Sequence, residues 1–375
     1  MAQTPRALKI AIFVSFANVA GAQIAALRLA HGLKDKGHDV TVRFLYEQVP
    51  VNSTDHPHEV VLKTARPGVK GYLKIVRTVY QTLKREKPDV VLTFLPLACV
   101  IGQTCAWAAG IKTRVVSHRM PINTASSVMR KLDLLLAWAG AYTKVICVSN
   151  AVRATCRNYP KWLLDRTVVV HNGLLGFVPS LLSKADARAR FGIPADQFTL
   201  VAIGRFVPQK HYPLMLEVVS RLDDVLLVIG GDGFLRQSLE AEIARLGIGH
   251  KVKLLGNVGR ADVPDLLQAG DAFIQTSTYE GQSNTVLEGL TAGIPMVLHD
   301  VPEQRETIED PQTGKLAGEL VPLNDVDGWV AAIERLRRDT SSRDAASEQA
   351  RRQAQLFTYD RMIDGFNRTL QPEQP

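Results

Sequence analysis

Residues Ala272–Asp300 read AFIQTSTYEGQSNTVLEGLTAGIPMVLHD, a segment with two short apolar runs separated by a stretch of helix length. The runs AFIQTS and MVLHD have the length and composition of buried strands. Between them, Ser283 is a favourable N-cap for a helix that begins near Asn284, and Gly293 and Pro295 mark its end. Strand, helix and strand in this order indicate a parallel pair in an α/β sheet.

The same alternation extends in both directions along the chain and predicts two α/β domains. The first half contains the strand-like runs KIAIFV, DVTVRFL, EVVLK, DVVLTFL, TRVVSH, KVICVS and TVVVHN, and the second half FTLVAIG, DVLLVIG, VKLLG, AFIQTS and PMVLHD. Continuous apolar strands separated by helices are typical of doubly wound, Rossmann-like parallel sheets. We expect domains at residues 1–178 and 179–355, and a final helix within 356–375 that returns to the first domain.

Composition is consistent with two buried cores and with a cytoplasmic location. The chain has 375 residues, of which 46% are hydrophobic and 22% charged, and no apolar run approaches the roughly 18 to 20 residues that span a bilayer. The four cysteines lack the spacings of a zinc site or disulfide framework, which indicates a reducing compartment. The apolar run that begins at Lys9 could belong to a signal peptide, but the helical spacing after it favours a first buried strand.

The two halves differ in charge. Residues 1–180 hold 24 Lys and Arg against 9 Asp and Glu, a net charge of +15, whereas residues 181–375 hold 21 against 28, a net charge of −7. A basic half suggests an anionic partner, either nucleic acid or a membrane surface. The lack of interleaved aromatic residues or a groove-reading motif argues against nucleic acid.

A predicted helix near residues 72–86 carries much of the basic charge. Its basic residues are Lys74, Arg77, Lys84 and Arg85, and Leu73, Val76, Val79 and Leu83 lie opposite them. This pattern fits peripheral contact with the inner face of an anionic membrane. It fits at least as well an ordinary solvated helix whose apolar stripe faces the core.

The segment after AFIQTS is a candidate phosphate site. It lies at the carboxyl end of a parallel strand, and the first amides of the following helix, including those of Asn284 and Thr285, suit an anion. Glu288, in the second turn, could accept hydrogen bonds from vicinal hydroxyls of a ribose, and Glu280 could bind a sugar on the other side of the phosphates. Alternatively, Glu280 is a solvated loop acid and Glu288 an ordinary helix residue.

Two further loops follow strands and are candidate parts of the same site. In AIGRFVPQKHY, Gly204 permits a tight turn, and Arg205 and Lys210 could neutralise a diphosphate, or could simply be solvated at the surface. SFANVAGAQIA contains Gly21, which allows close backbone approach, but lacks the Gly-x-Gly-x-x-Gly dinucleotide fingerprint.

Together these segments resemble the retaining glycosyltransferases of family 4, which have the GT-B fold of two Rossmann-like domains that face each other across a cleft. Glu280 and Glu288 match the family's Glu, seven residues, Glu signature, which continues as LEGLTAGIP. Other family features recur in order: KIAIFV with GHDV, PDVVLTF, VICVSNAVR, VVVHNG, GRFVPQK, LLVIGGDGFLR, VKLLGNV and DVPEQRETIEDPQTGKL. The resemblance covers nearly the whole chain.

The resemblance implies roles for individual residues. Arg205 and Lys210 would hold the donor diphosphate, Glu288 the ribose and Glu280 the hydroxyls of the transferred sugar. The remaining donor-binding positions would be Gly21, Gly204, Gly281, Ser283, Asn284 and Thr285, and His118, in VVSHRMP, would lie near the donor sugar. His118 alone would instead be interpreted as a core or loop histidine.

The chain also departs from the family pattern at two places. Many relatives have two adjacent glycines in the first loop, followed by an acid, where this chain has Ala20, Gly21 and Gln23. Gln282, Ser283 and Asn284 replace the Phe-Gly type that often follows the first acid. Both departures lie in segments expected to contact the donor.

The reaction that the resemblance implies is transfer of a sugar from a nucleoside-diphosphate donor to a saccharide or lipid-linked saccharide, with retention. The reaction would take part in the synthesis of cell-surface polysaccharide, lipopolysaccharide or glycolipid. No Asp-x-Asp motif follows a strand, so we expect no metal and no cofactor. Alternatives are an epimerase of the same fold, a phosphorylase, which would require pyridoxal phosphate, and a non-enzymatic protein that binds anionic surfaces or nucleic acid.

Overall fold

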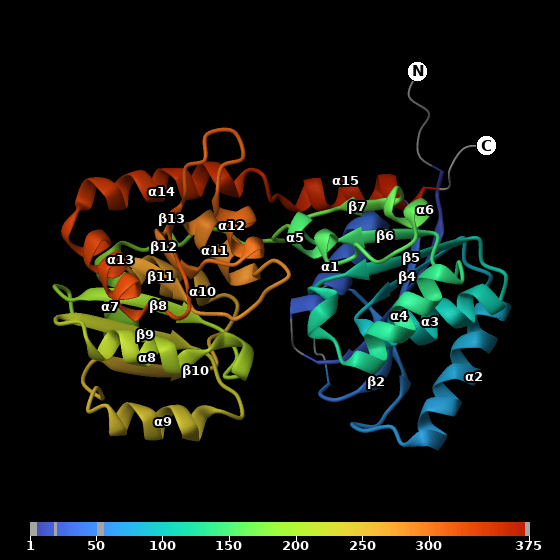
Figure 1. The fold of residues 1–375 in the computed structure, drawn as a ribbon, viewed down its shortest axis with the longest axis horizontal. Helices are drawn as coiled ribbons and strands as arrows, with labels where there is room; N and C mark the ends of the chain where they lie inside the picture. Colours follow the sequence, from blue (N-terminus) through green and yellow to red (C-terminus); the bar gives the residue numbers. More distant parts are fainter. Residues whose placement is uncertain (1–5, 19–20, 51–55, 372–375) are drawn as a thin grey trace. The chain divides into compact units, whose positions relative to one another are not determined.

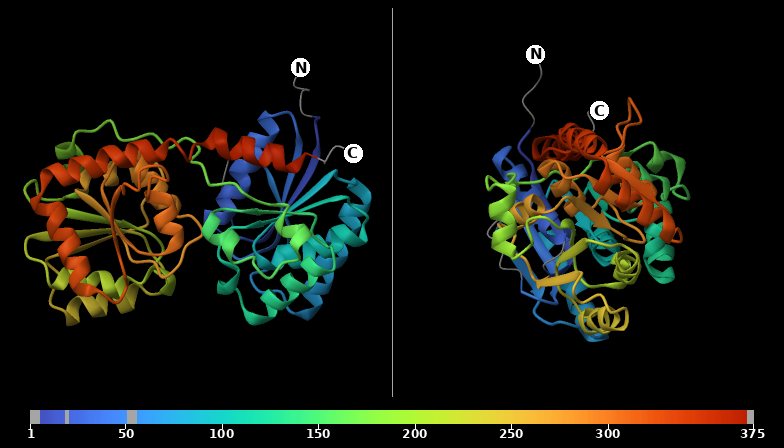
Figure 2. Two further views of the ribbon diagram at one scale, coloured as in Figure 1. Left: turned by 45° about the horizontal axis from the view of Figure 1, so that its top comes forward. Right: turned by 90° about the vertical axis from the view of Figure 1, so that its left-hand side faces the viewer.

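The computed structural model describes residues 6–18, 21–50 and 56–371. The chain divides into two compact units. The N-terminal unit contains Met1–Gly173 and Tyr359–Pro375, and the C-terminal unit contains Leu174–Thr358. Each unit is a parallel sheet with helices on both faces (Figures 1 and 2).

Within its described residues, the N-terminal unit has a seven-stranded parallel sheet in the order β3-β2-β1-β4-β5-β6-β7. The strands are β1 (Lys9–Ala17), β2 (Asp39–Glu47), β3 (His58–Leu62), β4 (Val90–Phe94), β5 (Thr113–His118), β6 (Lys144–Cys147) and β7 (Thr167–Val169). The α-helices of this unit are α1 (Gly21–Asp35), α2 (Val69–Glu86), α3 (Pro96–Ala108), α4 (Ser127–Trp138), α5 (Asn150–Ala154), α6 (Lys161–Leu164) and α15 (Tyr359–Leu370), and Ile122–Thr124 forms a 3-10 turn.

The C-terminal unit has a six-stranded parallel sheet in the order β10-β9-β8-β11-β12-β13. The strands are β8 (Phe198–Ile203), β9 (Val225–Gly230), β10 (Val252–Gly256), β11 (Ala272–Gln275), β12 (Met296–His299) and β13 (Gly318–Val321). The α-helices are α7 (Lys184–Phe191), α8 (Tyr212–Ser220), α9 (Arg236–Arg245), α10 (Val263–Ala269), α11 (Asn284–Ala292), α12 (Pro302–Ile308), α13 (Val326–Arg338) and α14 (Thr340–Ala354), and Pro208–Lys210 forms a 3-10 turn.

These sheets confirm the predicted pair of doubly wound α/β domains. In both units the strand order reverses beside the first strand, between β1 and β4 and between β8 and β11. The central strands are buried on both faces, which explains why they appear in the sequence as continuous apolar runs. The short edge strand β13 was not among the predicted strands. It begins at a glycine and is only partly buried, so it lacks that apolar signature.

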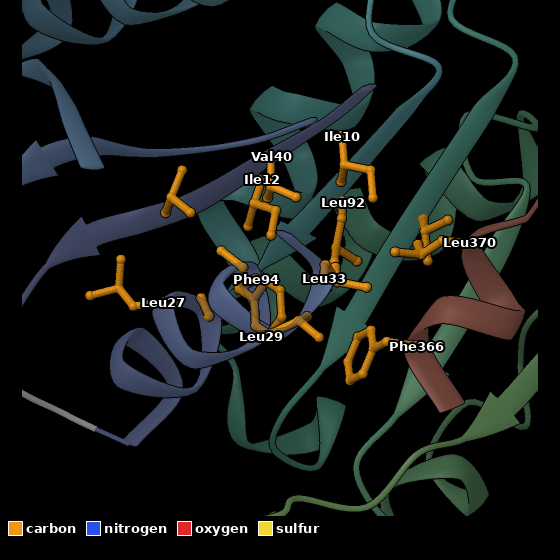
Figure 3. Close-up of a cluster of buried hydrophobic side chains, with 14 of the residues drawn as sticks. Ile10, Ile12, Leu27, Leu29, Leu33, Val40, Leu92, Phe94, Phe366 and Leu370 are labelled. Atoms are coloured by element: carbon orange, nitrogen blue, oxygen red, sulfur yellow. The ribbon is translucent and has the colours of Figure 1, made fainter. Parts of the chain in front are cut away.

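The helix α15 belongs to the core of the N-terminal unit (Figure 3). Phe366 packs with Phe94 of β4, their ring centroids 6.4 Å apart, and Leu370 lies in the same cluster. The Tyr359 hydroxyl donates a hydrogen bond to the carbonyl of Arg28 at 2.7 Å. The predicted final helix that returns to the first domain is therefore confirmed.

The predicted apolar residues of α2 are divided between the core and the surface. Val79 and Leu83 face the core, but Leu73 and Val76 are exposed. The core face is completed by Ile75 instead, one turn before Val79.

The run at Lys9 forms the central strand β1, as the strand interpretation of that run requires.

Candidate active site

The candidate site of the C-terminal unit lies at the point where its strand order reverses. The loops that follow β8 and β11 leave adjacent parallel strands at their carboxyl ends, where α/β sheets bind ligands. Hydrogen bonds join the two loops: the amide of Thr278 donates to the carbonyl of Gln209 at 2.8 Å, and the Gln209 side chain donates to the carbonyl of Tyr279 at 2.8 Å. The two loops therefore form one connected surface.

An ion pair links the two loops through side chains. Lys210 Nζ lies 2.8 Å from Glu280 Oε1, and both side chains are largely buried. Gln275 Nε2 donates to the same carboxylate oxygen at 3.4 Å. Glu280 is thus a buried, paired carboxylate and not a solvated loop acid, and a buried charge requires such partners.

The side chain of Gln275 organises the start of α11. The hydroxyls of Ser283 and Thr285 donate to Gln275 Oε1 at 3.0 and 3.1 Å, and the two hydroxyl oxygens lie 3.0 Å apart. Ser283 occupies the N-cap position, as predicted, but its side chain does not cap the helix. The Ser283 hydroxyl is directed to Gln275 and does not bond the amides at the start of α11.

Tyr212 and Gly231 hold the loop after β8 in place through contacts with Gly204. The Tyr212 hydroxyl donates to the carbonyl of Gly204 at 2.9 Å, and burial, together with the nearby charge of Glu280, raises the pKa of Tyr212. Gly231 packs so closely that a Cβ at this position would lie 1.9 Å from the Gly204 carbonyl oxygen. By contrast, the Arg205 side chain is exposed and makes no hydrogen bond or ion pair with the part of the chain that the structure describes.

The other predicted positions of this unit lie on the same loop and helix. Gly281 is buried in the loop that precedes α11, Asn284 is the first residue of α11, and Glu288 is partly buried in its second turn. Nine of the predicted positions therefore lie on the two joined loops and on α11: Gly204, Arg205, Lys210, Glu280, Gly281, Ser283, Asn284, Thr285 and Glu288.

Three neighbouring residues were not predicted. Gln275 and Tyr212 are described above, and the third is Glu303, in the first turn of α12. Burial raises the pKa of Glu303, and the negative charges of Glu280 and Glu306 raise it further. Glu303 follows β12 by a few residues and lies at the same edge of the sheet as Glu280. Its position after a predicted strand could have identified it as a candidate site residue.

The remaining two predicted residues, His118 and Gly21, belong to the N-terminal unit. His118 ends β5, and its Nε2 lies 2.8 Å from the hydroxyl of Tyr159. That hydroxyl donates its proton to Asp133, which also accepts a hydrogen bond from Tyr142 at 3.0 Å. Since Tyr159 has one proton to give, His118 Nε2 must be the donor to its oxygen, which leaves Nδ1 as the acceptor of the neutral ring.

Burial lowers the pKa of His118 from its ordinary value of 6.5, and the negative charge of Asp133 partly opposes that effect. The neutral imidazole is therefore favoured.

Gly21 is exposed and begins α1. Ala20, the other notable residue of the first loop, lies outside the described residues.

No group of three or more His, Cys, Asp or Glu residues in the described ranges is arranged to hold a metal ion. Likewise, no helix among them is both long enough and apolar enough to cross a bilayer.

Family models match both units. Residues 19–174 match the model described as Glycosyltransferase Family 4, and residues 183–353 match Glycosyl transferases group 1. The chain is 31% identical over 266 residues to the lipopolysaccharide core biosynthesis glycosyltransferase LpsE of Rhizobium meliloti, covering 71% of this chain and 70% of LpsE. The chain belongs to glycosyltransferase family 4.

This family 4 glycosyltransferase is also similar to two further proteins. It is 27% identical over 286 residues, 71% of each chain, to the Escherichia coli UDP-Gal:alpha-D-GlcNAc-diphosphoundecaprenol alpha-1,3-galactosyltransferase. Its fold matches that of Anabaena Alr3699/HepE, solved in complex with UDP and glucose, with a TM-score of 0.82 and 22% identity over 97% of this chain and 99% of HepE. The GT-B fold expected from the sequence is thus confirmed.

Proposed function

We propose that this glycosyltransferase moves a sugar from a nucleoside-diphosphate donor to a hydroxyl of a saccharide or lipid-linked saccharide, with retention of anomeric configuration and without a metal ion or other cofactor. The observation that carries the proposal is the cluster at the start of α11, where Lys210, Glu280 and Gln275 converge. A cation, a carboxylate and the amides of a helix start are the groups that a sugar diphosphate requires.

Each group has a defined task in this proposal. The Arg205 guanidinium and the Lys210 ammonium neutralise the charge that grows on the diphosphate as its bond to the sugar breaks. Glu280 accepts hydrogen bonds from hydroxyls of the transferred sugar, and Glu288 accepts them from the ribose. The leaving phosphate oxygen takes the proton of the acceptor hydroxyl on the same face, so the protein supplies position and charge stabilisation.

The relatives suggest the substrates to try first. HepE was solved with UDP and glucose, and the Escherichia coli relative is named for UDP-galactose and a diphosphoundecaprenol-linked acceptor. LpsE is named for lipopolysaccharide core synthesis. We therefore propose UDP-hexoses as donors, a cell-surface saccharide or glycolipid as acceptor, and a location in the cytoplasm or at the inner face of the membrane.

The proposal is tested by a thermal-shift screen against nucleotide sugars, followed by product analysis with and without saccharide acceptors. A binding donor raises the melting temperature according to its concentration relative to its dissociation constant.

Arg205→Ala and Lys210→Ala should each lower turnover about 100-fold or more, as loss of a preorganised charge does. Turnover near the wild-type level in both variants would show that the diphosphate binds elsewhere.

The same incubations address the alternatives. An epimerase would convert the nucleotide sugar without any acceptor, whereas a transferase releases nucleoside diphosphate together with a glycosylated product. The anomeric configuration of that product, determined by NMR, tests retention. Loss of activity in a chelator would contradict the proposed metal independence.

A further inference from the structure

The helix α2 has two apolar faces, of which the fold uses one. Ile75, Val79 and Leu83 are buried in the core. A second row of apolar residues, Val69, Leu73, Val76 and Tyr80, is exposed, with Val69 and Leu73 exposed to 79% and 65%. These four recur every three or four residues, so they lie on one side of the helix, which runs at the periphery of the N-terminal unit (Figure 1).

A basic row runs beside the exposed apolar row. Lys70, Lys74 and Arg77 each follow an apolar residue of that row by one position, which turns them by about 100° around the helix, and Lys84 continues this side. In the part of the chain that the structure describes, Lys70, Lys74 and Arg77 form no ion pair.

The acidic residue of α2 does not neutralise this row. Glu86 accepts hydrogen bonds from Arg43 Nη1 and Nη2 at 3.0 and 2.9 Å, so its charge is matched by a buried arginine of β2. Arg85 shares the same carboxylate at 3.1 Å. The charges of the basic row therefore remain available to an external anionic partner.

We propose that the exposed face of α2, formed by the apolar row and the basic row, docks the protein on an anionic lipid bilayer. In a helix that lies in the plane of a bilayer, apolar side chains enter the acyl boundary and basic side chains reach the headgroups. From Val69 to Tyr80 the apolar row is about 16 Å long, and the adjacent basic row suits the anionic lipids of a cytoplasmic leaflet. The net charge of +15 over residues 1–180 adds long-range attraction.

Charge and polarity argue against two other occupants of this face. A second copy of the chain, docked through the same surface, would place two uncompensated basic rows against each other, which is repulsive. Nucleic acid would match the basic row, but phosphate and base edges offer little to Val69, Leu73 and Val76. A bilayer satisfies both rows at once.

This inference deepens the proposed function, and rests on it only in one respect: a bilayer-bound enzyme would meet a lipid-linked acceptor in the plane of the membrane. Docking itself can be measured without donor or acceptor. Failure to bind vesicles would therefore leave the proposed sugar transfer standing, and failure to transfer sugar would leave the docking surface standing.

The test is co-sedimentation of the full chain with vesicles of phosphatidylcholine, with and without about one third phosphatidylglycerol. The wild-type chain should bind the anionic vesicles, and binding should fall steeply between about 0.05 and 0.5 M salt. Lys70→Gln/Lys74→Gln/Arg77→Gln should weaken binding about 100-fold, at roughly fivefold per charge. Val69→Ser/Leu73→Ser should weaken it about tenfold or more.

Two variants of the C-terminal unit serve as matched controls. Arg245→Gln/Lys315→Gln/Arg338→Gln removes the same number of positive charges from exposed residues. Val178→Ser/Leu181→Ser removes one Val and one Leu that are exposed to 64% and 98%. Both controls should bind anionic vesicles as the wild type does. Equal losses in controls and α2 variants, or equal binding to vesicles of phosphatidylcholine alone, would overturn the proposal.

A probe on α2 tests the location of the surface. The four cysteines, Cys99, Cys105, Cys147 and Cys156, are buried, so Leu73→Cys provides a selectively reactive thiol for an environment-sensitive fluorophore. Its emission should shift to the blue on addition of anionic vesicles. An unchanged emission while the protein sediments with vesicles would assign binding to another surface, and a dimer that the α2 variants abolish in light scattering would assign this face to a second copy.

Discussion

At the residue scale, one ion pair joins two positions for which the sequence predicts separate tasks. Lys210 is predicted to hold phosphate and Glu280 to hold a sugar, yet their side chains contact each other at 2.8 Å. A buried carboxylate requires a partner, and the loop after β8 provides it. The pair therefore contributes to the shape of the site as well as to its proposed chemistry.

Lys210→Met should destabilise the fold because it leaves the buried Glu280 carboxylate without its cation. We expect the free energy of unfolding to fall by about 3 kcal/mol. Adding Glu280→Gln to Lys210→Met should restore much of that loss, since the unpaired charge is then removed. Urea denaturation of the two single variants and the double variant measures this coupling. Strictly additive losses would show that the two side chains do not stabilise each other.

The stability of the N-terminal unit should depend on the protonation of His118. Burial holds the pKa of His118 below 6.5, so the unfolded chain binds a proton that the folded chain does not bind between those two pKa values. The free energy of unfolding should thus be highest above pH 6.5 and fall as the pH is lowered, by up to about 1.4 kcal/mol per pH unit from this group.

His118→Gln should remove this part of the pH dependence, because it replaces the titrating ring with a neutral amide. Burial lowers the pKa of His56 and His299 as well, so the variant should retain a shallower slope. Unfolding measured between about pH 5 and 8 tests this expectation. His250→Gln, which removes an exposed histidine, is the control and should follow the wild-type slope more closely.

At the element scale, the sequence predicts strands better than it predicts the faces of helices. Each predicted strand is present, because a strand buried on both faces needs an unbroken apolar run. Leu73 and Val76 have the spacing of core residues and share that spacing with the buried Val79 and Leu83, yet both are exposed. Spacing identifies a helix side but cannot show how many sides of that helix the fold covers.

The site was predictable in part for a similar reason. The succession of strand-like runs along the chain identifies the loops that carry Lys210 and Glu280 as loops that follow strand ends. The role of Gln275 was not predictable, because in the sequence it is only the last residue of an apolar, strand-like run. Its contacts depend on the packing of α11 against β11. The contact between Lys210 and Glu280 likewise depends on the conformations of two loops, which spacing does not describe.

Gly231→Ala should disturb the loop after β8. A Cβ at residue 231 would lie 1.9 Å from the Gly204 carbonyl oxygen, so the backbone must move. We expect a loss of about 3 kcal/mol in the free energy of unfolding and weaker binding of nucleoside diphosphate, measured by calorimetry. Gly249→Ala is the control, because its Cβ would meet no atom within 4 Å. Similar behaviour of the two variants would contradict the steric argument.

At the scale of the whole molecule, each unit has its own core, and each core can be weakened separately. Phe366→Ala removes a buried ring from the N-terminal unit, and Trp329→Ala removes one from the C-terminal unit. Each should cost about 3–5 kcal/mol. Hydrogen exchange should accelerate in β1 and β4 for Phe366→Ala, and in β8 and β9 for Trp329→Ala. Acceleration of both sheets by either variant would show that the cores unfold together.

The position of α15 has a consequence for biosynthesis. β1, at the centre of the first sheet, emerges early from the ribosome, but α15, which covers part of that sheet's core, is synthesised after the whole C-terminal unit. At cellular rates, translation of the intervening unit takes on the order of 10 to 40 s. During that time the apolar surface that α15 will cover, including Phe94, lacks its final partner. The unit made first is the last to be completed.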